Sequence, residues 1–102
     1  MLIAEFSMYP LDKGDSLSEY VAGSLDIVDR SGLPYRLGPM GTAIEGEWDE
    51  VMGVIRACYE RMRQDCRRIE CVVKIDAREG KGGRLSEKVQ SVEAKLGRPL
   101  KK

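Results

Sequence analysis

Four carboxylates stand where strands or helix starts are expected, and their positions could support chemistry: Glu5, Glu45, Glu47 and Asp76. Glu45 is the most unusual, because a strand inside a small sheet rarely carries a bare carboxylate. Such a group faces solvent, pairs with a basic neighbour, or lines a pocket on the sheet. The four could in principle hold a divalent cation, but Lys74 and Arg78 compete for their charge and no D-x-D-x-D-G pattern is present. We therefore predict no metal site.

The chain has no histidine, so the commonest general base and the commonest metal ligand are both missing. The cysteines Cys58, Cys66 and Cys71 are odd in number and lack C-x-x-C spacing, which is typical of reduced cytosolic thiols. Cys58 and Cys71 are predicted in the core, whereas Cys66 lies in a loop beside two arginines that could lower its pKa. We predict no catalytic residue and no cofactor. An acid–base enzyme that uses Glu45 or Asp76 remains an alternative.

The length of 102 residues predicts a single domain over 1–102. Lys plus Arg and Asp plus Glu are both 17, so the formal charge is zero, which argues against a nucleic-acid partner and permits self-association. The first residues indicate a strand rather than a basic-then-apolar leader, and no apolar run approaches the length of a membrane span. We therefore expect a cytoplasmic protein.

The hydrophobic pattern predicts four strands and three helices. Strands are expected at 2–9, 34–38, 42–46 and 69–76, and helices at 17–30, 48–64 and about 85–96. Ser16 and Glu19 read as a capping box for the first helix, and Trp48 as a core anchor of the second. Pro39 and Gly41 bracket a tight turn in which glycine would supply a positive φ. The segment 79–83, which includes Lys81, is predicted to be a flexible connector rather than a phosphate loop.

This order, β-α-β-β-α-β with a further helix, predicts an α+β fold: a ferredoxin-like sandwich with an extra C-terminal helix. In that plan the strands lie in the order 4-1-3-2, and Glu5 and Lys74 are neighbours on the face away from the helices. That face also carries Ile3, Tyr9 and Val72 among the charges. A bare face of this kind is usually covered by a second copy, so we expect a homo-oligomer, a dimer or tetramer.

Several segments together resemble the small thiamine-binding protein family. They are Ser7-x-x-Pro10, Tyr20-Val21, Ser31-Gly32-Leu33-x-Tyr35, Pro39-Met40-Gly41-Thr42-x-Ile44-Glu45-Gly46-Glu47, Lys74-Ile75-Asp76-x-Arg78 and Lys88-Val89-x-Ser91-Val92-Glu93. The resemblance spans nearly the whole chain, and Met40–Gly46 is its most specific part. It implies a ferredoxin-like fold, a dimer or tetramer, and thiamine or its pyrimidine portion as the ligand.

The residue types suit that ligand. A carboxylate such as Glu45 could hold the aminopyrimidine, hydroxyls could bond to it, and aromatic or sulfur groups could lie against a ring or the cationic thiazolium. The residues predicted to bind the ligand are Ser7, Tyr9, Tyr35, Met40, Thr42, Glu45, Glu47 and Asp76. Lys74, Asp76 and Arg78 are alternatively structural ion pairs. The other hypothesis is an oligomeric interaction module without a small-molecule ligand, in which Glu45 forms an ion pair between subunits.

Overall fold

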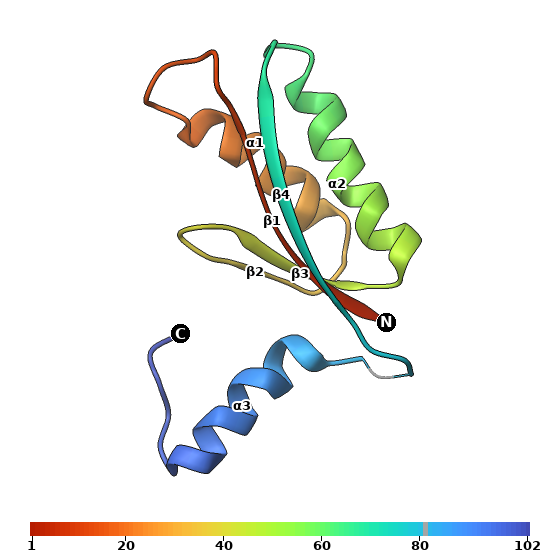
Figure 1. Ribbon diagram of the computed structural model, residues 1–102, viewed down its shortest axis with the longest axis vertical. Helices are drawn as coiled ribbons and strands as arrows, with labels where there is room; N and C mark the ends of the chain where they lie inside the picture. Colours follow the sequence, from red (N-terminus) through yellow and green to blue (C-terminus); the bar gives the residue numbers. More distant parts are fainter. Residues whose placement is uncertain (81) are drawn as a thin grey trace.

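The computed structural model describes residues 1–80 and 82–102, and Lys81 lies outside them. It consists of one four-stranded antiparallel sheet and three helices (Figure 1). The elements are β1 (Leu2–Pro10), α1 (Ser18–Arg30), β2 (Tyr35–Leu37), β3 (Thr42–Gly46), α2 (Trp48–Met62), β4 (Ile69–Ala77) and α3 (Arg84–Leu96). The strand order β2-β3-β1-β4 is the predicted ferredoxin-like order.

The core lies between the sheet and the helix pair α1 and α2. Alternate residues of β1 point inward, and all of them are buried: Leu2, Ala4, Phe6 and Met8. Val51, Ile55, Cys58 and Met62 of α2 recur at helical spacing and are buried with them, as is Val28 of α1. The strict two-residue period of β1 thus predicted its inner face correctly.

The backbone hydrogen bonds of β1 alternate between its two neighbours, β4 and β3. The backbone N–H of Arg78 donates to the carbonyl of Met1 at 3.1 Å, and that of Leu11 to the carbonyl of Arg68 at 2.8 Å. The backbone N–H and carbonyl groups of odd-numbered β1 residues therefore bond to β4. By alternation, the backbone groups of even-numbered β1 residues point towards β3. This alternation decides which backbone groups are free at each edge.

Two local predictions are wrong at helix starts. Leu17, not Ser16, precedes α1, and it makes no side-chain cap hydrogen bond, so the predicted capping box does not form. Trp48 is 55% exposed rather than a core anchor, because it opens α2 on the outer side of the helix. Instead, Glu50 caps α2: its Oε1 accepts the backbone N–H of Glu47 at 2.9 Å.

Two of the three cysteine predictions need correction. Cys58 is buried as predicted, but Cys71 is exposed, because β4 is an edge strand whose inner face the helices leave partly open. Cys66 is buried in its loop, and that burial raises the pKa of its thiol, opposite to the effect expected from the arginines beside it.

The third helix stands apart from the other two (Figure 1). It contacts mainly β3 and leaves Val92 and Leu96 about half exposed. Gly97 ends it with φ +74°, a left-handed conformation that glycine adopts without strain. Among the described residues no helix is long and apolar enough to cross a membrane.

Candidate functional site

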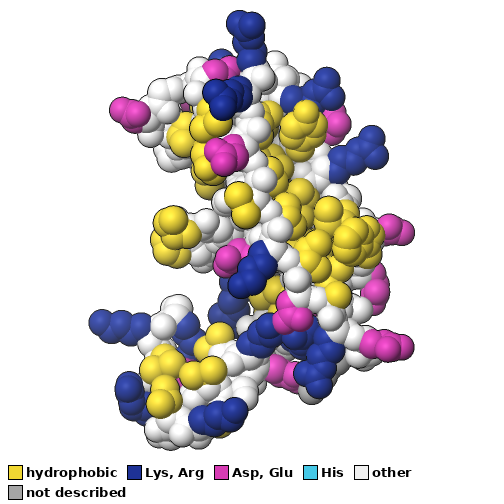
Figure 2. Space-filling model, in the orientation of Figure 1, with side chains coloured by type: hydrophobic (Ala, Val, Ile, Leu, Met, Phe, Trp, Pro, Cys, Tyr) yellow, Lys and Arg dark blue, Asp and Glu magenta, His cyan; other side chains and the backbone are white. Residues whose placement is uncertain are grey.

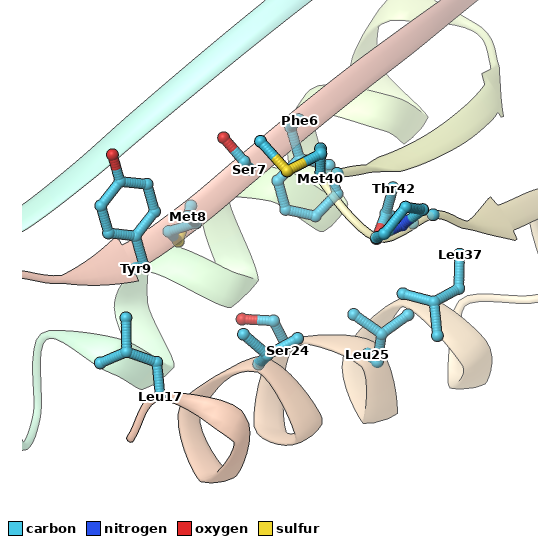
Figure 3. Close-up of a pocket in the computed structure, with 14 residues that line it drawn as sticks. Phe6, Ser7, Met8, Tyr9, Leu17, Ser24, Leu25, Leu37, Met40 and Thr42 are labelled. Carbon is cyan, nitrogen blue, oxygen red and sulfur yellow. The ribbon is translucent and has the colours of Figure 1, made fainter. Parts of the chain in front are cut away.

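A mainly apolar cleft lies where the β2–β3 hairpin stops short of the end of β1. Its volume is about 460 Å³, and its walls come from β1, the hairpin turn and one side of α1 (Figure 3). The lining residues are Phe6, Ser7, Met8, Tyr9, Leu17, Val21, Ser24, Leu25, Leu37, Gly38, Pro39, Met40, Gly41 and Thr42. This size and composition are typical of small-molecule sites.

The cleft exists because β3 pairs with only part of β1. The pairing of these strands ends at Phe6 and Thr42, whereas β1 continues to Pro10. Met8 is an even-numbered residue, so its backbone N–H and carbonyl point towards the side that β3 has left. The cleft therefore offers a backbone donor and a backbone acceptor on one strand edge.

A tight turn places the hairpin against this edge. The backbone N–H of Gly38 donates to the carbonyl of Gly41 at 2.9 Å, which leaves Pro39 and Met40 as the loop. Gly41 does not have the positive φ that we predicted. It is needed for close approach instead, since a Cβ there would lie 3.1 Å from the carbonyl oxygen of Phe6.

Ser24 is the unusual polar group of the cleft. It is only 5% exposed, and its Oγ has no hydrogen-bond partner among the described residues. Figure 3 shows Ser24 and Leu25 projecting from α1 towards the strand side of the cleft. A buried hydroxyl without a partner costs free energy, so such a group is a candidate for contact with a ligand.

The cleft brings together four of the predicted ligand residues: Ser7, Tyr9, Met40 and Thr42. Thr42 is buried, Met40 is 87% exposed at the rim, and Ser7 and Tyr9 lie half-buried on β1. The pKa of Tyr9 is raised by its hydrogen bond to Glu70 and by the charge of that carboxylate, so the phenol is neutral at pH 7. Among the described lining residues none is charged at that pH.

The other predicted ligand residues lie elsewhere. The hydroxyl of Tyr35 donates to Oδ1 of Asp29 at 2.8 Å, which raises the pKa of the tyrosine. Glu47 lies 3.5 Å through Oε2 from the N-terminal amine of Met1. The Oδ2 atom of Asp76 accepts hydrogen bonds from Arg84 Nη2 at 2.8 Å and from Lys88, which hold the pKa of Asp76 below its usual value.

Glu45 fastens α3 to the sheet. It is 3% exposed, and its two carboxylate oxygens accept the backbone N–H groups of Gly83 at 3.1 Å and Arg84 at 2.8 Å. These N–H groups begin α3, where the helix dipole also favours a negative charge. A smaller hollow of about 310 Å³ lies beside Glu45, but both oxygens are already engaged within the chain.

Sequence reasoning missed the α1 wall of the cleft, namely Leu17, Val21, Ser24 and Leu25. One signal was available. Ser24 follows Val21 by three residues and precedes Val28 by four, so a polar residue interrupts the apolar stripe of the helix. The free backbone edge of Met8 depends on where the hairpin ends, which the pattern of side chains does not reveal.

The sequence and the fold of this chain are similar to those of known proteins. The sequence model described as thiamine-binding protein matches residues 4–93. A UPF0045 protein of Mycobacterium bovis is 36% identical over 96% of this chain and 97% of its own length. A crystal structure of a hypothetical protein from Methanocaldococcus jannaschii is 30% identical, with a TM-score of 0.82 over 89% of this chain and 94% of that one.

A further solved structure, from Thermotoga maritima, has the same fold. It is named a "putative thiamine biosynthesis/salvage protein" and has a TM-score of 0.79 at 23% identity, covering 89% of this chain and 97% of that one. Together with the family match over most of the sequence, these likenesses confirm the ferredoxin-like α+β fold. The chain belongs to the thiamine-binding protein family.

Proposed function

We propose that this protein is a non-catalytic binder of thiamine or its pyrimidine portion, and that the aminopyrimidine ring enters the cleft between β1 and α1. The family match supports the ligand class. The observation that carries the location is the buried, unpartnered hydroxyl of Ser24, which faces an uncharged cleft beside the unpaired edge of β1.

The hydrogen-bonding groups of the cleft match those of an aminopyrimidine. That ring presents an amino donor next to a ring-nitrogen acceptor. The N–H and carbonyl of one extended residue, Met8, point to the same side of the strand and offer the complementary pair. The ring thus takes the place of the next residues of β3, and Ser24 and Thr42, which line the same space, supply hydroxyls to bond to it.

The charge of the cleft favours the pyrimidine over the thiazolium in its interior. Burying a cation among uncharged groups is costly, since no lining carboxylate compensates it. Tyr9 and the exposed Met40 lie towards the rim, where an aromatic face attracts a cation that remains partly hydrated. In this arrangement the pyrimidine is inside and the thiazolium is near solvent.

The same residues support binding without catalysis. The Tyr9 phenol is the one ordinary acid–base group among the described lining residues, and the Glu70 carboxylate raises its pKa further from neutrality. A general acid or base works best when its pKa is near the working pH. A tyrosine of this kind donates a hydrogen bond but does not exchange protons efficiently at pH 7.

We also propose that the protein is cytoplasmic and self-associates, with the bare face of the sheet taking part. An odd number of cysteines supports a reducing compartment. The alternative function, an interaction module without a small-molecule ligand, is favoured by the exposed apolar residues Val72, Val73 and Ile75 of β4.

The test is a thermal-shift titration with hydroxymethylpyrimidine, thiamine and thiamine diphosphate. A ligand at about 100 times its Kd stabilises the native state by about 2.7 kcal/mol. For a domain of this size that raises Tm by on the order of ten degrees. We expect both the free pyrimidine and thiamine to produce a shift, because the proposal places the pyrimidine ring in the interior.

The variant Ser24→Ala tests whether the ligand binds in this cleft. The variant should keep the Tm of the unliganded protein, since its hydroxyl has no partner to lose, and should bind the pyrimidine roughly tenfold more weakly. Ser91→Ala, an exposed serine of α3, is the matched control and should bind normally. The proposal fails if neither the pyrimidine nor thiamine shifts the wild-type protein.

A further inference from the structure

A second cleft lies at the corner where the end of α2 leads into β4. Its volume is about 610 Å³, and its lining residues are Tyr59, Arg63, Cys66, Arg67, Arg68 and Ile69. Three of these six side chains are guanidinium groups, and none of the described lining residues is a carboxylate. Figure 2 shows several Lys and Arg side chains at this end of the molecule. The corner cleft is therefore cationic, unlike the uncharged cleft between β1 and α1.

Most of the positive charge in the corner cleft has no partner within the chain. The side chains of Arg67 and Arg68 are exposed and form no hydrogen bond or ion pair with another described residue. Nη1 of Arg63 lies 3.6 Å from Oε2 of Glu60. Burial raises the pKa of the Cys66 thiol, so this lining group adds no negative charge at pH 7. Among the described residues, only Glu60 thus forms an ion pair with one of the three guanidinium groups.

The backbone of this corner is held in place by hydrogen bonds to the loop after β1. Oδ2 of Asp12 accepts the backbone N–H of Arg67 at 2.8 Å, and this bond is the largest cause that lowers the pKa of Asp12. The backbone N–H of Leu11 donates to the carbonyl of Arg68 at 2.8 Å. Asp12 therefore orders the corner through the backbone and forms no ion pair with either guanidinium group.

The other lining residues supply an aromatic and apolar surface. Tyr59 is 42% exposed, and the guanidinium carbon of Arg63 lies 5.9 Å from the centre of its ring, a cation–π contact. Ile69 is half-buried against the hydrophobic core, and Cys66 is buried. The corner cleft thus combines cations with a partly exposed ring, an arrangement that suits a ligand with one anionic and one apolar part.

We propose that the corner cleft binds a small organic phosphate. The phosphate contacts the guanidinium groups of Arg67 and Arg68, and the organic part lies against Tyr59 and Ile69. A guanidinium presents N–H donors in a planar fork that matches the oxygens of a phosphate, and these charge-assisted hydrogen bonds are stronger than neutral ones. The volume of about 610 Å³ is in the range of small-molecule sites, so it has room for the organic part as well.

The charges favour a phosphate monoester over a carboxylate or a nucleic acid. A phosphate monoester carries a charge of about −1.5 to −2 at pH 7, which matches the two unpaired cations Arg67 and Arg68, whereas a carboxylate carries one charge. A nucleic-acid strand needs basic groups along an extended surface. Here the formal charge of the whole chain is zero, and the unpaired arginines of the cleft lie at one corner.

The corner cleft is separate from the cleft proposed for the pyrimidine. The two have no lining residue in common. One is lined by β1, α1 and the β2–β3 hairpin, and the other by α2, the loop after it and the first residue of β4. Phosphate binding at the corner therefore does not depend on the function proposed above.

Phenyl phosphate is a suitable probe, because it joins a phosphate monoester to one aromatic ring. Calorimetric titration should show saturable binding of phenyl phosphate to the wild type. Inorganic phosphate, which lacks the ring, should bind more weakly, and phenol, which lacks the charge, should not bind measurably. Equal affinities for phenyl phosphate and inorganic phosphate would contradict the contact with Tyr59 and Ile69.

A pair of double variants tests the arginines. The variant with Arg67→Gln and Arg68→Gln should bind phenyl phosphate at least about tenfold more weakly, because charge-assisted hydrogen bonds to the phosphate are lost. It should fold normally, since neither side chain has a partner among the described residues. The matched control carries Arg56→Gln and Arg61→Gln, which remove the same charge from exposed positions of α2 outside the cleft. This control should bind phenyl phosphate as the wild type does.

Backbone amide NMR shifts of the wild type locate the probe without any substitution. Phenyl phosphate should shift the amides of 59–69 and leave those of the pyrimidine cleft unchanged. The proposal is overturned by a wild type that does not bind phenyl phosphate, by shifts confined to other parts of the chain, or by an equal loss of affinity in the two double variants. Circular dichroism shows whether each variant is folded. If the Arg67 and Arg68 variant does not fold, the amide shifts still decide the question.

Discussion

At the scale of single residues, neither Glu45 nor Ser24 has the role that its residue type suggests. The carboxylate looks like a ligand group, but its two oxygens bind the first N–H groups of α3. The serine looks like an ordinary helix residue, but its hydroxyl is buried in the cleft without a partner. A residue's type therefore indicated the chemistry available, while its neighbours along and across the fold determined its use.

Replacing Glu45 should loosen α3 and spare the ligand site. Glu45→Gln keeps one acceptor oxygen for the helix start but sets an NH2 donor against the other backbone N–H, so one of two charge-assisted hydrogen bonds is lost and the other loses its charge; bonds of this kind contribute about 1.5–3 kcal/mol each. We expect faster amide hydrogen exchange across 84–96 and unchanged affinity for the pyrimidine. Glu79→Gln, an exposed carboxylate of the nearby loop, serves as the control. Loss of ligand binding with normal exchange would instead make Glu45 a ligand group.

At the scale of elements, the cleft results from a mismatch in strand length. β1 has nine residues and β3 has five, so the hairpin leaves the far half of β1 unpaired on that side. The two-residue loop at Pro39 and Met40 fixes where this happens. The strand and helix periods predicted all seven elements, since side-chain burial follows those periods directly.

Element boundaries and edges were harder to predict. The apolar alternation of Ile69, Cys71, Val73 and Ile75 indicated an inner face, yet most of that face is exposed. Alternation reports which side of a strand is more apolar, but not whether a helix covers it. For the same reason the sequence identified four residues of the cleft and missed its α1 wall, because the helix position depends on tertiary packing.

Gly41 should be sensitive to any side chain. Gly41→Ala places a Cβ 3.1 Å from the carbonyl oxygen of Phe6, so the hairpin must move away from β1. We expect a loss of about 1–3 kcal/mol of stability, as for other overpacked sites, and weaker pyrimidine binding. Urea unfolding and a ligand titration measure the two effects. Gly53→Ala, an open helical position, should stabilise or leave stability unchanged. An unaltered Gly41→Ala protein would contradict this account of the turn.

The attachment of α3 should weaken in acid. Lys88 and Arg84 hold the pKa of Asp76 below its usual value, so the folded state favours the ionised carboxylate. The contribution is therefore complete above the unfolded pKa, near 4, and is lost as pH falls through the lower folded value. Hydrogen exchange of 84–96, corrected for the intrinsic rate, should report the release. Asp76→Asn should remove this pH dependence; an identical acid profile in that variant would refute the assignment.

At the scale of the whole molecule, the sheet and two helices form two layers, and two surfaces expose apolar residues. One is β4, which pairs with β1 alone among the described residues and exposes Val72, Val73 and Ile75. The other is α3, which stands apart and exposes Val92 and Leu96 (Figures 1 and 2). The cleft proposed to bind the ligand is lined by residues of β1, α1 and the β2–β3 hairpin, and by none of β4 or α3.

The most direct test of the central claim is calorimetric titration of hydroxymethylpyrimidine into the wild type and two tryptophan variants. Val21→Trp enlarges a partly exposed residue of the cleft wall, whereas Val92→Trp makes the same change at an exposed position of α3. We predict saturable binding with one ligand per chain in the wild type and in Val92→Trp, and its loss in a folded Val21→Trp. Normal binding by Val21→Trp would contradict the proposed site, and no binding by the wild type would contradict the proposed ligand.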